Sequence, residues 1–174
     1  EYDPYTAKLV LGNFVYAIKP MITISLMIFF LYRTKLTGRF AKRIFIGLFM
    51  GLVGDTMLMF ADTSQMFFMY GLLAFLLGHV AYITAFYLDF KRVKSFINQI
   101  SIMAIIIFSV YCVAYFLVLN PYLAEMKYPV LAYAIVIAIM GIFALCRYNT
   151  VGEVSFKFVL IGALLFLISD SALG

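Results

Sequence analysis

The amino-acid sequence predicts an all-α protein, a polytopic transmembrane helix bundle of about six to seven spans. Of its 174 residues, 66% are hydrophobic and 12% are charged. Soluble domains are nearer half apolar, and about a quarter of their residues are charged. Apolar runs also follow one another with only short polar connections between them. We therefore expect residues 1–174 to form a single transmembrane domain.

Six apolar runs define the expected helices, at 9–32, 44–60, 66–88, 98–119, 129–146 and 157–173. The first run contains Lys19-Pro20, which predicts either one kinked span or a short segment followed by a helix from Pro20. Strands are not expected, because open strands leave backbone groups unsatisfied in lipid and the alternation of a membrane barrel is absent. Because the chain opens with Glu1 and stops at Gly174 within an apolar run, we expect truncation at both ends.

Basic residues are concentrated in alternate connections. Lys and Arg occur at 33–43, 89–94 and 147–157, whereas the connection around Asp62 has none and 120–128 is nearly neutral. The positive-inside rule places the basic connections in the cytoplasm and the amino end outside. This pattern accounts for the net charge of +5 without nucleic acid as a partner. We expect a multi-pass protein of the bacterial inner membrane.

Four ionisable residues lie inside the expected spans: Lys19, Asp55, His79 and Asp170. Such groups are costly in lipid, so they usually face a bundle interior or a water-filled cavity and mark functional sites. Counted along each helix, all four fall in the outer half or middle of the membrane. A single buried aspartate also suits a structural hydrogen bond between helices.

Small and aromatic residues share the helix faces that carry these groups, which predicts that those faces contact protein. The three stripes are Gly47, Gly51 and Asp55; Gly71, Phe75, His79 and Tyr82; and Gly162, Ala163, Phe166 and Asp170. Ser169 stands beside the last carboxylate, and Tyr133 follows Pro129 at a similar depth. The glycines also fit simple packing, and the tyrosines also fit ordinary core or interfacial positions.

Taken together, these segments resemble the YhhN-like lysoplasmalogenase family. The matching segments are Lys19-Pro20, Gly51-Leu52-Val53-Gly54-Asp55, Gly71-Leu72-Leu73-Ala74-Phe75, Gly78-His79-Val80-Ala81-Tyr82, Pro129-Val130-Leu131-Ala132-Tyr133, Gly162-Ala163-Leu164-Leu165-Phe166 and Ser169-Asp170-Ser171. The resemblance implies an eight-helix membrane protein, here a fragment without its terminal helices. It also implies hydrolysis of the vinyl ether bond of lysoplasmalogens, which releases a fatty aldehyde and a glycerophospho-base.

Acid catalysis suits that bond, because protonation of the carbon beta to oxygen yields an oxocarbenium ion that water captures. Such a reaction needs one carboxyl group that holds its proton and one that stays ionised. We therefore expect Asp55 and Asp170 to act as acid and stabiliser, with His79 orienting water or holding a carboxylate.

The remaining site residues are expected to bind the substrate. Tyr82 and Tyr133 would donate hydrogen bonds, Lys19 would bind the lysophospholipid phosphate or neutralise an aspartate, and Ser169 would complete the site. No cofactor and no metal are expected.

Three other interpretations are open at this stage. Buried Asp, His and Lys residues also form the relays of proton- or ion-coupled transporters, although paired helix breaks in corresponding halves are absent. His79, Asp55 and Asp170 suffice numerically for a catalytic zinc, but no H-E-x-x-H cluster accompanies them. A purely structural bundle is the third interpretation.

Cys112 and Cys146 lie in apolar runs and indicate no disulfide framework or zinc ribbon.

Overall fold

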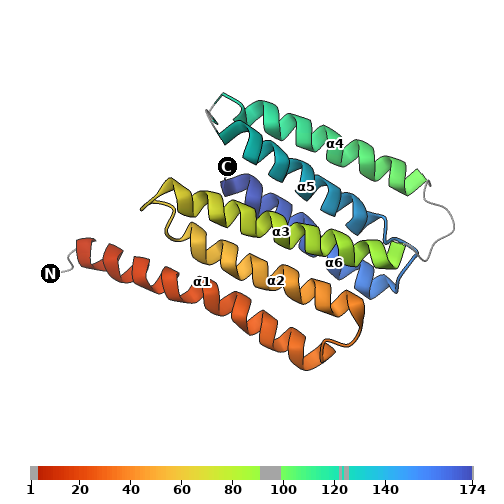
Figure 1. Ribbon diagram of the computed structural model, residues 1–174, viewed down its shortest axis with the longest axis horizontal. Coiled ribbons are helices and arrows are strands. Elements are labelled where there is room, and N and C mark those ends of the chain that lie inside the picture. Colours follow the sequence, from red (N-terminus) through yellow and green to blue (C-terminus); the bar gives the residue numbers. More distant parts are fainter. Residues whose placement is uncertain (1–3, 91–98, 122, 124–125, 174) are drawn as a thin grey trace. The chain divides into compact units, whose positions relative to one another are not determined.

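Six α-helices make up the described structure (Figure 1). The computed structural model describes the chain apart from residues 1–3, 91–98, 122, 124–125 and 174, and of residues 4–17, 90 and 170–173 it describes only the backbone. The helices are α1 (Pro4–Thr34), α2 (Gly38–Leu58), α3 (Gln65–Phe90), α4 (Gln99–Leu119), α5 (Lys127–Leu145) and α6 (Glu153–Leu173). No strand occurs within the described ranges, so the predicted all-α class is confirmed.

Three helices begin at least four residues earlier than the apolar runs predicted. α1 begins at Pro4 rather than at 9, α2 at Gly38 rather than at 44, and α6 at Glu153 rather than at 157. The added segments contain charged residues, which form helix readily although they do not extend an apolar run. α1 continues through Pro20 as one helix, so the alternative of a separate segment before the proline is wrong.

Within the part of the chain that the structure describes, three helices are long and apolar enough to cross a membrane: α3 over Gln65–Asp89, α4 and α5. This finding supports a membrane protein, but it makes the prediction of six to seven spans too high. Charged residues interrupt the other helices, leaving charge-free stretches at 20–32 in α1, 44–54 in α2 and 158–169 in α6. Each is shorter than the roughly 20 apolar residues that a spanning helix needs.

The described chain divides into two compact units, Glu1–Gly78 and His79–Gly174, and α3 contributes to both. The expectation of a single domain stays a prediction.

In the first unit, α1 packs against α2. The first part of α3 packs against α2 through glycines. A Cβ atom placed on Gly54 would lie 2.7 Å from the ring of Phe75, and one placed on Gly78 would lie 3.2 Å from the carbonyl oxygen of Gly47.

In the second unit, α5 packs against both α4 and α6. Phe108 of α4 is buried directly against Gly141 of α5, where no side chain would fit. The last part of α3 contacts α5 through Tyr87 and Phe143, whose ring centroids are 6.1 Å apart. Most of the exposed side chains of α4 are apolar, as expected for a helix that faces lipid. They include Ile102, Met103, Ile106, Val110, Val113 and Leu117.

Candidate functional site

Asp55 lies near the end of α2 in the first unit, where α1 supplies its polar neighbours. The Thr23 hydroxyl of α1 donates a hydrogen bond to Asp55 Oδ2 over 3.4 Å. Lys19 is exposed on α1, and its positive charge acts on the Asp55 carboxyl group. The carboxyl group is half-buried, so it combines partial shielding from solvent with an oriented donor and a nearby cation.

His79 packs among three aromatic rings in the second unit. Its side chain is 1% exposed. Phe166 of α6 lies 4.7 Å from the imidazole centroid, Tyr133 of α5 lies 5.4 Å away, and Tyr82 of α3 lies 6.4 Å away. All three rings meet the imidazole edge-to-face, at interplanar angles of 80–89°. These four residues are called the His79 pocket below.

The His79 pocket brings together three residues that sequence reasoning selected for the site: His79, Tyr82 and Tyr133. It adds Phe166, which the sequence placed on a stripe but not in the site. Edge-to-face contacts with three rings hold the imidazole in one orientation and exclude water from it. A buried imidazole held in this way can orient a reactant or transfer a proton without reorganising at the moment of reaction.

The predicted stripe from Gly71 to Tyr82 is divided between two packing surfaces. Gly71 and Phe75 contact α2, whereas His79 and Tyr82 take part in the pocket with α5 and α6. On α2, Gly47 and Gly54 make the close approach, while a Cβ atom on Gly51 would meet open space.

The other predicted site residues lie on α6. Ser169 is exposed. The side chain of Asp170 lies outside the described residues, so its pairing with Asp55 stays a prediction. Among the side chains that are described, no three His, Cys, Asp or Glu residues form a group able to hold a metal ion.

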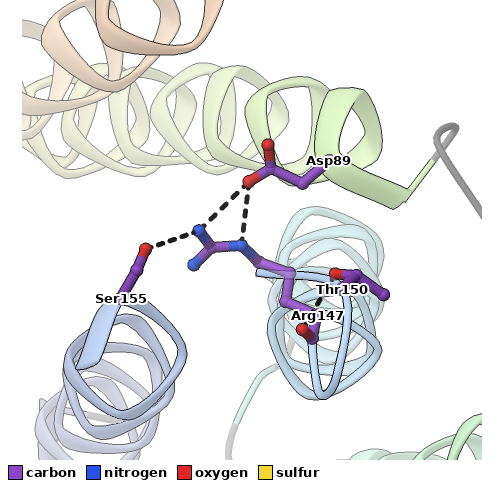
Figure 2. Close-up of polar contacts among 4 residues, drawn as sticks. All are labelled: Asp89, Arg147, Thr150 and Ser155. Atoms are coloured by element: carbon purple, nitrogen blue, oxygen red, sulfur yellow. Dashed lines mark hydrogen bonds and ion pairs between the residues drawn. The ribbon is translucent and has the colours of Figure 1, made fainter. Parts of the chain in front are cut away.

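A buried ion pair is the feature that sequence reasoning missed. Arg147, just after α5, is 1% exposed, and its Nε and Nη2 atoms each lie 3.1 Å from Asp89 Oδ2 of α3. Nη2 also donates to the Ser155 hydroxyl of α6 over 3.1 Å (Figure 2). The guanidinium carbon stands 5.3 Å from the ring centroid of Phe86, within the range of a cation–π interaction.

A tight turn presents Arg147 to these partners. Its carbonyl oxygen accepts hydrogen bonds from the Thr150 backbone N–H and hydroxyl, at 3.0 and 2.8 Å (Figure 2). Asn149 provides the left-handed backbone of this turn, with φ of 58°. Burial lowers the pKa of Arg147 from its ordinary value, and the Asp89 carboxylate opposes that effect. The sequence feature that could have indicated this ion pair is the position of Asp89 and Arg147, each at the end of a helix and in a basic connection.

Comparison with known families identifies the chain. The YhhN family model matches residues 14–174, a range that includes Asp55, the His79 pocket and Asp170. No curated protein and no solved structure matches the chain. The family match confirms the resemblance drawn from the sequence motifs, and the chain belongs to the YhhN family.

Proposed function

We propose that this protein is a membrane-embedded hydrolase that cleaves the vinyl ether bond of lysoplasmalogens. The observation that carries the proposal is the family match over residues 14–174, because lysoplasmalogenase is the known activity of this family. Helices able to cross a membrane agree with a lipid substrate. The His79 pocket adds a titratable group shielded from water.

The proposed reaction begins with proton transfer from a carboxylic acid to the vinyl carbon beta to the ether oxygen. The resulting oxocarbenium ion accepts water, and the water loses a proton as the new carbon–oxygen bond forms. The hemiacetal then releases a fatty aldehyde and the glycerophospho-base. One water is consumed, and each catalytic proton is returned. A second, ionised carboxylate stabilises the cation, as in other reactions with oxocarbenium-like transition states.

Asp55 and Asp170 are the carboxyl groups proposed for these two roles, and His79 is proposed to orient the attacking water or to hold a carboxylate. The hydrogen bond from Thr23 and the charge of Lys19 support a functional Asp55, because both are directed at its carboxyl group. Lys19 and Ser169 are proposed to contact the lysophospholipid, with Tyr82 and Tyr133 as hydrogen-bond donors.

Aldehyde release by the full-length protein tests the proposal. With a lysoplasmenyl-ethanolamine substrate in proteoliposomes, Asp55→Asn and Asp170→Asn are each expected to lower turnover at least ~100-fold, the usual contribution of a general acid or base. The control is Asp62→Asn, because Asp62 is an exposed carboxylate outside the helices. Near-normal turnover in both test variants would refute the proposed roles. Proton flux driven by substrate without any product would instead indicate a transporter.

A further inference from the structure

Two sets of contacts join the same three segments of the second unit. In the His79 pocket, α3 supplies His79 and Tyr82, α5 supplies Tyr133 and α6 supplies Phe166. At the ion pair, α3 supplies Asp89, the turn after α5 supplies Arg147 and α6 supplies Ser155 (Figure 2). The His79 pocket and the ion pair are therefore two connections among one group of helices. Ten residues separate His79 from Asp89 along α3, or about 15 Å.

A column of side chains on one face of α3 links the two. His79, Tyr82, Phe86 and Asp89 follow one another at helical spacings of three or four residues, so they share that face. Tyr82 meets the imidazole edge-to-face at 6.4 Å and stacks on Phe86 at 6.4 Å with an interplanar angle of 10°. Phe86 in turn lies under the Arg147 guanidinium. Consecutive contacts therefore run from the His79 imidazole through Tyr82 and Phe86 to the Arg147 guanidinium.

We propose that Arg147 is a positioning residue: with Asp89 and Ser155 it fixes the end of α3 against α5 and α6, and through the Phe86–Tyr82 column it fixes the orientation of the His79 imidazole. The ion pair is suited to this task because it is buried and directional. The guanidinium presents two N–H groups to Asp89 and a third contact to Ser155, which leaves it little rotational freedom.

The consequence for turnover rests on the proposed function, whereas the consequence for the imidazole does not. If His79 acts on the reacting groups, a small change in its placement lowers the rate of the chemical step more than it weakens substrate binding. The 174-residue sequence contains one histidine, and the His79→Phe variant identifies its resonances when the full-length protein is labelled with ¹⁵N-histidine.

The test compares the His79 resonances and the kinetic constants of four variants of the full-length protein. Arg147→Lys keeps a cation. Arg147→Met combined with Asp89→Leu removes both charges together, because a single replacement would leave a buried charge unpaired and endanger folding. The control removes the exposed pair Glu153 and Lys157, whose charged atoms are 2.6 Å apart, by Glu153→Gln with Lys157→Gln. Asp89→Arg with Arg147→Asp inverts the buried pair.

Loss of the buried pair is expected to shift or broaden the His79 ¹⁵N resonances and to lower kcat roughly tenfold with little change in KM. Arg147→Lys should give an intermediate spectrum, the inverted pair should move back toward the wild type, and the control should match the wild type. A folded double variant with unchanged His79 resonances would overturn the positioning role. If the wild type has no lysoplasmalogenase activity but the double variant still shifts the His79 resonances, the positioning role is upheld and the proposed function is refuted.

Discussion

At the scale of single residues, His79 combines polarity with nearly complete burial. Its side chain is 1% exposed among the rings of Tyr82, Tyr133 and Phe166. If the imidazole served packing alone, another ring would serve as well. If it acts in the reaction, its nitrogen atoms are required.

The substitution His79→Phe separates these two roles. A phenyl ring keeps the edge-to-face contacts, so we expect the thermal midpoint in detergent to fall by only a few degrees, equivalent to about 1 kcal/mol in a domain of this size. Aldehyde release should fall at least ~100-fold, because the ring has no group that can transfer a proton or orient water. Turnover within threefold of the wild type would show that His79 is only a packing residue.

At the scale of helices, glycines determine how closely α2 approaches the first part of α3. Gly54 has no room for a side chain because Phe75 occupies the space, whereas Gly51, one turn earlier on α2, faces open space. Both glycines belong to the motif 51–55, so the motif combines a packing requirement with the carboxylate of Asp55.

Replacing each of these glycines by alanine tests the packing. Gly54→Ala should destabilise the protein by ~1–3 kcal/mol, because its methyl group would overlap the Phe75 ring. Gly51→Ala should be neutral or stabilising by up to ~1 kcal/mol, because alanine favours helix and meets no neighbour. Unfolding in mixed micelles measures both. Equal effects of the two substitutions would contradict the packing described here.

The helices were largely predictable from the sequence, because apolar runs in a membrane protein coincide with helices. The starts of α1, α2 and α6 were missed, since charged residues extend a helix without extending its apolar run. The grouping of His79 with Tyr82 follows from helical spacing. The burial of Arg147 does not, because its partner Asp89 lies 58 residues away and only tertiary packing brings the two together.

At the scale of the whole molecule, the protein is a membrane protein, and its described residues include three helices suited to spanning. The alternating basic connections predict that the residues before α3 face outside and those after α5 face the cytoplasm. The three other helices are interrupted by charges, and this is why apolar content alone overestimated the number of spans.

Cysteine labelling in whole cells tests this orientation. Thr63→Cys and Gly152→Cys place single thiols at exposed positions before α3 and after α5, in a background with Cys112→Ala and Cys146→Ala. A membrane-impermeant maleimide should label residue 63 in intact cells and residue 152 only after permeabilisation. Labelling of residue 152 alone in intact cells would indicate the opposite orientation. Labelling of both residues in intact cells would contradict the predicted orientation.

The central claim is that hydrolysis begins with protonation of carbon. The most direct test is to compare kcat/KM of the full-length protein in H₂O and in D₂O, each measured on the plateau of its pH profile. If transfer of a proton to carbon is the first and irreversible step, kcat/KM is expected to be lower in D₂O, because the bond to the transferred proton is partly broken in the transition state. An equal or higher kcat/KM in D₂O would contradict the mechanism.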